Sequence, residues 1–330
     1  MDELIKLIKE LNDPIFNRIF DCKVERAKQK FPKKLKEEIK EGEEQKIYIF
    51  KNKILNQETH FNIWRAKRKE PQKESQIKSD YDPFCNPQEQ TPLDNLGRLE
   101  NEYAITASNL AKISSNHSLV IFKKHNKNDL NLFDFYNGLN LAYEWFKKNT
   151  YPIWALIFNY GLRAGASIEH PHFQIFSFEE LPAKIKDIYE KITKYNEKYN
   201  SDYFVDFFQV LNKLNLAKQL NNIEIAINLT PFKDKEIIFW NKEFETSLKE
   251  ISLILEVYKE FSENFNMFLI KLDNKILGYL LDRGESYKLN SDIGALEIYA
   301  FSVVGFDLLE FSRNFIQKLE EKALEFQIPW

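Results

Sequence analysis

The segment from Gly165 to Phe176 constrains the fold of this chain more than any other, because it reads Gly-Ala-Ser-Ile-Glu-His-Pro-His-Phe-Gln-Ile-Phe. Successive side chains of a β-strand point to opposite faces of its sheet. If this segment is extended, His170, His172 and Gln174 project to one face, and the aromatic and aliphatic residues between them project to the other. The pattern predicts a strand with a packed apolar face and a polar face that carries a site.

The residues before this segment predict a buried strand that ends at a loop of small residues. Trp154 to Phe158 is a continuous apolar run, and residues 159–167 follow it with two of the nine glycines. An apolar run bounded by glycine is typical of such a strand. A lone His-x-His pair could be structural, with both imidazoles partly buried. The small-residue loop, the Ser167 hydroxyl and Gln174 in phase favour a chemical role instead.

These residues resemble the signature of the galactose-1-phosphate uridylyltransferases, the transferase branch of the histidine-triad superfamily, which also includes dinucleotide phosphorylases. The matching pattern is Asn159, then Gly165-Ala166-Ser167, then His170-Pro171-His172-x-Gln174. Hydrolases of the superfamily carry a third histidine where this chain has Gln174, so the glutamine is similar to the transferase branch. The resemblance implies an enzyme in which His172 is the nucleophile of a ping-pong nucleotidyl transfer.

The resemblance also implies which groups surround the nucleophile. The catalytic residues are then His172, Gln174 and Ser167, and the backbone N–H groups of residues 164–166 would also donate to phosphate oxygens. The substrate-binding residues that it implies are Arg65, Arg68, Asn101, Asn159, Gly165 and Ala166.

Several of these positions have alternatives. Residues 65–71 could be an exposed basic turn, and Asn101 could be a turn residue before a strand. Phe173 and Glu169 depart from the residues usual in uridylyltransferases, which leaves the subfamily open.

A structural zinc site is implied by the same resemblance, in a modified form. Many family members carry Cys-x-x-Cys where this chain has Asp82-Pro83-Phe84-Cys85, so that Asp82 replaces the first cysteine. His125 and His170 would be the third and fourth ligands. Zinc accepts sulfur, nitrogen and carboxylate oxygen in a tetrahedron, so this set is chemically allowed. The alternative is a site that has lost its metal. We expect no second metal site, because residues 201–330 contain no histidine.

The order of the predicted elements indicates an α+β fold with two related halves. Periodic apolar patterns predict strands and helices in a similar order before and after residue 200. The resemblance implies two histidine-triad-like halves that form one extended, mostly antiparallel sheet flanked by helices. Residues 46–200 would be the half with the catalytic motif, and residues 201–330 the half without histidines.

Three further segments carry specific secondary-structure predictions. The apolar spacing of Leu4, Ile5, Ile8 and Leu11, followed by a stretch dense in Lys and Glu, predicts an N-terminal helical extension over residues 1–45. Residues 202–220 are predicted as one helix. Residues 295–304 are predicted as one strand.

Composition restricts the partners and the compartment. The formal net charge is −3, so no global basic field indicates binding to nucleic acid or to an anionic membrane. The two cysteines, Cys22 and Cys85, provide no disulfide framework. The N-terminus lacks the pattern of a signal peptide, and no run approaches 18 apolar residues. We therefore expect a cytoplasmic protein.

Three functions stay open on the sequence alone. A uridylyltransferase of galactose metabolism would pass a nucleotidyl group from a nucleotide sugar to a sugar 1-phosphate. A dinucleotide or nucleotide-sugar phosphorylase would use inorganic phosphate as the acceptor. A nucleotide-binding protein without catalysis is the third option, and the intact residues 170–174 argue against it. Relatives commonly dimerise, so a homodimer is an option, although no residue identifies an interface.

Overall fold

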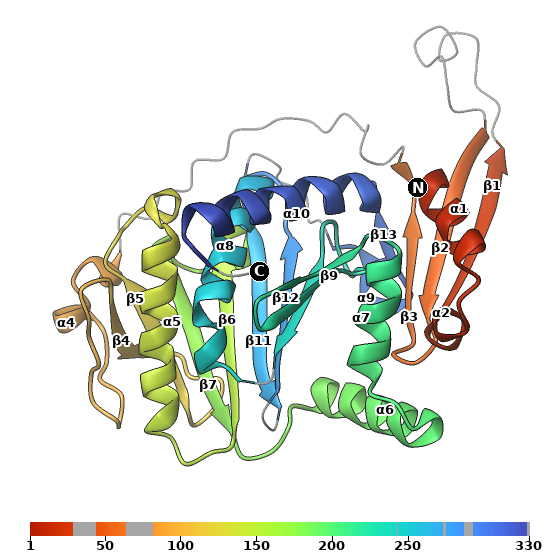
Figure 1. The fold of residues 1–330 in the computed structure, drawn as a ribbon. Helices are drawn as coiled ribbons and strands as arrows, with labels where there is room; N and C mark the ends of the chain where they lie inside the picture. Colours follow the sequence, from red (N-terminus) through yellow and green to blue (C-terminus); the bar gives the residue numbers. More distant parts are fainter. Residues whose placement is uncertain (29–43, 64–81, 242, 273–274, 287–292, 329–330) are drawn as a thin grey trace, which may run out of the picture.

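The computed structural model describes residues 1–28, 44–63, 82–241, 243–272, 275–286 and 293–328. Within these residues, two β-sheets and the helices packed on them form an α+β architecture (Figure 1), which confirms the predicted fold class. Among the described helices, none combines the length and the apolar character that crossing a membrane would require.

In the part of the chain that the structure describes, nine strands form a central sheet in which every neighbouring pair is antiparallel. The order across the sheet is β4 (Ala104–Ser108), β5 (His117–Phe122), β7 (His172–Phe178), β6 (Ile153–Tyr160), β11 (Phe265–Leu272), β12 (Lys275–Asp282), β10 (Ile237–Asn241), β9 (Ile223–Ile227) and β8 (Ala217–Leu220).

Strands from both predicted halves meet at the centre of this sheet, where β6 pairs with β11 and Phe158 lies opposite Met267. The predicted boundary at residues 200 and 201 falls in the short connection between α6 (Ala183–Tyr199) and α7 (Tyr203–Lys213). The division into two domains stays a prediction, but the sheet itself continues across it.

Helices cover one face of the central sheet (Figure 1). Helix α5 (Leu132–Lys147) lies next to α8 (Leu248–Phe261), and α10 (Leu308–Glu325) crosses α8. The apolar stripe of α5 is buried at helical spacing, and Asn131 caps its first turn. Short helical segments of the described chain lie at η2 (Pro83–Cys85), α4 (Pro87–Gln90), η3 (Lys127–Asp129), η4 (Leu162–Ala164) and η5 (Glu245–Ser247).

A smaller sheet lies beside the central one (Figure 1). Its described strands follow the order β1 (Phe20–Lys28), β2 (Glu44–Asn52), β3 (Gln57–Phe61) and β13 (Ser302–Val304), and β13 runs parallel to β3.

Helix α7 packs against the central sheet, because the rings of Phe204, Phe207 and Phe208 lie 5.5 to 6.1 Å from that of Trp240.

The helical prediction for residues 1–45 is wrong over residues 20–28 and 44–45, and its part over residues 29–43 lies outside the described residues. Helices α1 (Asp2–Leu11) and α2 (Pro14–Ile19) form as expected, but residues 20–28 form the strand β1. Most side chains of β1 are exposed. The strand exists because its backbone pairs with β2, which is a contact between distant residues that local spacing does not encode.

Two other predicted elements are each divided into a helix and a strand. The predicted helix over residues 202–220 ends with α7, because Asn215 adopts a left-handed backbone with φ 57° before β8 begins. The predicted strand over residues 295–304 begins instead as the helix α9 (Ala295–Tyr299). Glu297 accepts a hydrogen bond from the N–H of Gly294, which stabilises that first turn.

Gly138 allows α5 to approach the sheet closely. A Cβ atom at this position would lie 2.6 Å from Cε1 of Phe122 and 3.1 Å from Cε2 of Phe173. Both rings are fully buried. Phe173 therefore packs beneath α5, on the face of β7 opposite to His172, as the alternation of the sequence predicted.

We expect Gly138→Ala to lower the free energy of unfolding by about 1–2 kcal/mol, because overpacking against two fixed rings outweighs the gain in helix propensity. Urea titration of the purified variant measures this. The control is Asn140→Ala, at a half-buried position on the same helix, which gains helix propensity and should not lose stability. A Gly138→Ala variant as stable as the wild type would contradict the close packing.

Candidate functional site

The polar site predicted from the sequence lies on the face of the central sheet opposite to α5. His172 begins β7, and Gln174 follows it on the same face. Ile121 of β5 pairs with His172, and Leu119 pairs with Gln174. The structure thus brings two of the three predicted catalytic residues together on one strand.

The His172 side chain is held in one tautomer. Its Nδ1 lies 2.9 Å from the carbonyl oxygen of His170, and a carbonyl only accepts, so Nδ1 carries the proton. Nε2 makes no hydrogen bond with any described residue. The residue is buried, and burial lowers the pKa of His172, which keeps the imidazole neutral. A neutral imidazole with a free lone pair on Nε2 is suited to nucleophilic attack.

In the β6–β7 loop, residues 161–171, the backbone N–H groups that were predicted to bind a ligand form hydrogen bonds within the loop. The N–H groups of Ala164 and Gly165 donate to the carbonyls of Gly161 and Leu162, both at 3.0 Å, and the Ala166 N–H points to Gly161 at 3.4 Å. In this structure the three groups are engaged within the loop, so their donation to a ligand stays a prediction. Ser167 is exposed, and its hydroxyl makes no hydrogen bond with a described residue.

Residues of the second predicted half hold this loop in place. Asn266 on β11 donates from Nδ2 to Oδ1 of Asn159 and to the carbonyl of Ala164, both at 2.7 Å. Its own Oδ1 accepts from Nη1 of Arg283 at 2.7 Å. Because Oδ1 of Asn159 is already engaged, the amide NH₂ is the group that Asn159 can offer to a ligand. The sequence analysis missed Asn266 and Arg283.

A buried lysine fixes the start of the same loop. Lys127 donates from Nζ to the carbonyl of Glu263 at 2.6 Å and to Oδ1 of Asn264 at 3.1 Å, and burial lowers its pKa. A Cβ atom on Gly161, which has φ 95°, would lie 2.1 Å from that Asn264 oxygen and 2.7 Å from the lysine Nζ. Only glycine fits this close contact between the loop and the second half.

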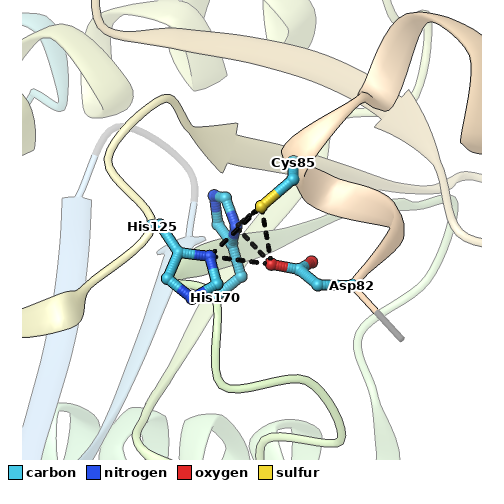
Figure 2. A group of neighbouring side chains, drawn as sticks. All are labelled: Asp82, Cys85, His125 and His170. Carbon is cyan, nitrogen blue, oxygen red and sulfur yellow. Dashed lines mark hydrogen bonds and ion pairs between the residues drawn. The ribbon is translucent and has the colours of Figure 1, made fainter. Parts of the chain in front are cut away.

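The four predicted metal ligands converge (Figure 2). One ligand atom from each of Asp82, Cys85, His125 and His170 lies within 4.8 Å of the others. Asp82 Oδ2 is 2.9 Å from Nδ1 of both histidines, and Cys85 Sγ is 3.2 Å from Nδ1 of His125. The structure therefore brings together the four residues that the family resemblance implied as metal ligands.

The orientation of His170 fits a bound cation. Its Nε2 donates to the carbonyl of Phe122 at 2.7 Å, so Nδ1 presents a lone pair to the carboxylate of Asp82. Two facing acceptors are stable when a proton or a cation lies between them. A thiol, a carboxylate and two imidazoles are a donor set that zinc accepts, and a hydrogen bond from the second ring nitrogen to a backbone carbonyl is typical of metal-bound histidine.

The cluster also closes one side of the site. Phe84, between Asp82 and Cys85, packs with Ile105 and Ile121, and its ring centroid lies 4.9 Å from that of His172. Asp82 caps this turn through the N–H of Phe84 at 2.9 Å. The loop that holds the candidate metal ligands is thus in direct contact with the predicted nucleophile.

The predicted substrate-binding residues that remain are Arg65, Arg68 and Asn101. Arg65 and Arg68 fall outside the described residues. Asn101 accepts from the N–H groups of Tyr103 and Ala104, both at 2.9 Å, and donates to the carbonyl of Asn137 on α5. Both ends of its amide are engaged in a turn before β4, so the structure favours the turn alternative for Asn101.

One residue near Gln174 received no role in the sequence analysis. His117, at the start of β5, places Nε2 3.1 Å from Oε1 of Gln174. His117, Leu119 and Ile121 alternate along β5 and therefore project to one face of the strand. This alternation in the sequence could have indicated that His117 faces the site.

Comparison with known proteins identifies the fold. No family model matches the sequence. Among solved structures, an ADP-glucose phosphorylase from Arabidopsis thaliana with bound ADP-glucose superposes with a TM-score of 0.61 at 13% identity, over 81% of this chain and 97% of that chain. A uridylyltransferase superposes with a TM-score of 0.56 at 12% identity, over 83% and 98% of the two chains. This chain has the uridylyltransferase fold.

A curated relative matches a smaller part of the sequence. The Lon protease of Mesomycoplasma hyopneumoniae (strain 232) is 26% identical over 161 residues, which are 48% of this chain and 18% of that protein. The chain thus spans less than a fifth of this relative. The structural match to the uridylyltransferase fold, by contrast, covers more than four fifths of this chain.

We expect Asn266→Leu to lower the free energy of unfolding by about 1–3 kcal/mol, because the apolar side chain leaves Asn159 Oδ1 and the Ala164 carbonyl without their donor. Urea titration measures the change. Asn128→Leu, at an exposed position, is the matched control and should stay within about 0.5 kcal/mol of the wild type. If Asn266→Leu behaves like this control, the contact between the halves does not hold the loop.

Proposed function

We propose that this protein is a nucleotidyltransferase that moves a nucleoside monophosphate from a nucleotide-sugar or dinucleotide donor to a phosphate acceptor through a covalent bond to His172. The observation that carries the proposal is the hydrogen bond from Nδ1 of His172 to the carbonyl of His170, which leaves the Nε2 lone pair free. The fold shared with an ADP-glucose phosphorylase and a uridylyltransferase supports the same conclusion.

In the first half-reaction, Nε2 of His172 attacks the α-phosphorus of the donor. An N–P bond forms, and the bond from this phosphorus to the bridging oxygen breaks. The leaving sugar phosphate or nucleoside phosphate keeps that electron pair. The imidazole becomes a cation that bears the nucleotidyl group, and the carbonyl of His170 stabilises it through Nδ1–H.

Donors around His172 would stabilise the charge that develops on the non-bridging phosphate oxygens. The candidates are the hydroxyl of Ser167 and the amide NH₂ groups of Gln174 and Asn159. One such donor contributes about 3–4 kcal/mol to a transition state when it is preorganised. The proposal also keeps Arg65 and Arg68 as ligands of the donor phosphates, since a guanidinium pairs with two phosphate oxygens at once.

In the second half-reaction, an oxygen of the acceptor phosphate attacks the same phosphorus. The N–P bond breaks, and its electron pair returns to Nε2, which restores the neutral imidazole. Inorganic phosphate and a sugar 1-phosphate present the same attacking oxygen, so the acceptor distinguishes a phosphorylase from a sugar-phosphate transferase. Assays that pair UDP-glucose and ADP-glucose with each acceptor separate the two activities.

The covalent intermediate is directly testable. Protein incubated with UDP-glucose or ADP-glucose that carries ³²P at the α-phosphorus should retain the label after denaturation, and the label should be released by acid, as a phosphoramidate requires. His172→Asn should reduce labelling to background, because asparagine keeps a donor near the Nδ1 position but has no nucleophilic Nε2.

His60→Asn is the matched control. His60 lies in the small sheet, with its ring stacked on Phe301 at 3.8 Å between centroids, so this variant should label like the wild type. Label that persists in His172→Asn would exclude His172 as the nucleophile. Absence of label from the wild type with every donor would overturn the proposed function.

We further propose that Asp82, Cys85, His125 and His170 bind a structural zinc ion, which would hold the 82–85 loop against the start of β7. Metal analysis of the purified protein should find about one zinc ion per chain. Removal by a chelator should lower the melting temperature, and added zinc should restore it.

Cys85→Ser should reduce the zinc content, whereas Cys22→Ser, in the small sheet, should leave it unchanged. A wild-type protein that lacks zinc and melts at the same temperature with and without chelator would favour the alternative of a site that has lost its metal.

A further inference from the structure

His117 is buried beside the predicted catalytic glutamine, with 1% of its surface exposed. Its ring stacks on Phe176 of β7 at 4.2 Å between centroids and 19° between planes. Phe176 is also the residue that pairs with His117 across β5 and β7. The imidazole is therefore fixed in position by the sheet and has no freedom to rotate away from Gln174.

The neighbours of His117 determine its tautomer. The backbone N–H of Ile113 donates to Nδ1 at 3.3 Å, so Nδ1 must present its lone pair. A neutral imidazole then carries its proton on Nε2. Gln174 Oε1 lies 3.1 Å from Nε2, and Nδ2 of Asn109 lies 3.2 Å from it.

The Asn109 amide presents its nitrogen, which only donates, to Nε2, because its Oδ1 is turned to the N–H of Ala111 and accepts from it at 2.9 Å. Gln174 Oε1 is thus the acceptor that the described residues offer to Nε2–H of His117. Burial lowers the pKa of His117, the nearby Lys112 ammonium acts in the same direction, and the bond to Gln174 opposes both. The imidazole therefore stays neutral and stays a donor.

This bond decides which end of the Gln174 amide is free. A side-chain amide has an acceptor end and a donor end, and rotation by about 180° exchanges them at little cost when nothing holds either one. Here the oxygen is held by His117, so the NH₂ group remains for a ligand on the same strand face as His172. A reversed amide would present its oxygen to the negatively charged oxygens of a phosphate.

We propose that His117 is a positioning residue that holds Gln174 with its amide NH₂ directed at the phosphate transferred to His172. This inference rests on the proposed function. It adds a role for His117, which would act on the substrate only through Gln174. His117 acts through Gln174 alone.

A double-mutant cycle tests this role. His117→Phe keeps a ring that can stack on Phe176 but removes the donor. In the wild-type background it should lower kcat for nucleotidyl transfer by roughly 10- to 100-fold, with a change in KM for the donor of less than about 3-fold, because the lost interaction belongs to the transition state. In a Gln174→Ala background, the same substitution should change kcat by less than about 2-fold.

His117→Gln provides the conservative rescue. A glutamine can place an N–H donor near the position of the imidazole Nε2, so this variant should keep kcat within about 5-fold of the wild type. Equal losses from His117→Phe in both backgrounds would overturn the proposal, because a residue that only supports the fold costs the same whether or not Gln174 is present.

A measurement without turnover tests the geometry separately. Nitrogen-15 NMR of the imidazole side chains should show His117 with its proton on Nε2 and His172 with its proton on Nδ1, and the neutral form of His117 should persist below pH 6.5. Gln174→Ala should shift the Nε2 resonance of His117. A proton on Nδ1 of His117 would overturn the proposal. If the wild type shows the expected tautomers but never labels, the proposed function fails while the orientation of Gln174 stands.

Discussion

The hydrogen bond from Nδ1 of His172 to the carbonyl of His170 is the interaction on which the chemistry of this site depends. It forms within a three-residue segment, His170-Pro171-His172, whose middle residue has no N–H to satisfy. The two imidazoles end in opposite tautomers, because the ring of His170 donates from Nε2 to Phe122. This short segment thus presents two lone pairs. Nδ1 of His170 faces the other candidate metal ligands, and Nε2 of His172 faces the predicted catalytic site.

The two faces of β7 differ in their side chains. The apolar face packs in the core, and this packing fixes the position of the polar face that carries His172 and Gln174. Phe173 is fully buried, and its ring centroid lies 4.9 Å from that of Phe122 and 4.8 Å from that of Phe158. Gly138 allows α5 to pack directly on this ring. A strand held this tightly positions His172 and Gln174 without help from a loop.

The sequence was sufficient for the strand that carries the site. The period of two from His172 to Phe178 predicted this strand, its two faces and the packing of Phe173, and the family resemblance implied the four converging ligands. Asn266, Arg283 and His117 were not identified. The first two reach the site only because β11 pairs with β6, and nothing in their own neighbourhood marks them. His117 differs from them, since its phase on β5 was visible but its partner Gln174 lies 57 positions away.

The secondary-structure errors have the same physical origin. Residues 20–28 look like an exposed charged helix by local composition, and they form β1 because β2 supplies a partner for their backbone. Asn215 ends α7 by adopting a left-handed conformation that a helical apolar pattern does not reveal. The pairing of a strand depends on residues far away in the sequence, whereas the spacing of apolar residues describes only the segment in which they lie.

The unbroken pairing of β6 with β11 has a mechanical consequence. The seven residue pairs between these described strands, from Tyr160 with Phe265 to Trp154 with Lys271, cross the line at which a two-domain enzyme would place its hinge. Swinging one half away from the other would break this ladder in the core of the sheet. In the proposed reaction, reactants would therefore enter and leave at the rim of the site, because the sheet beneath it is continuous.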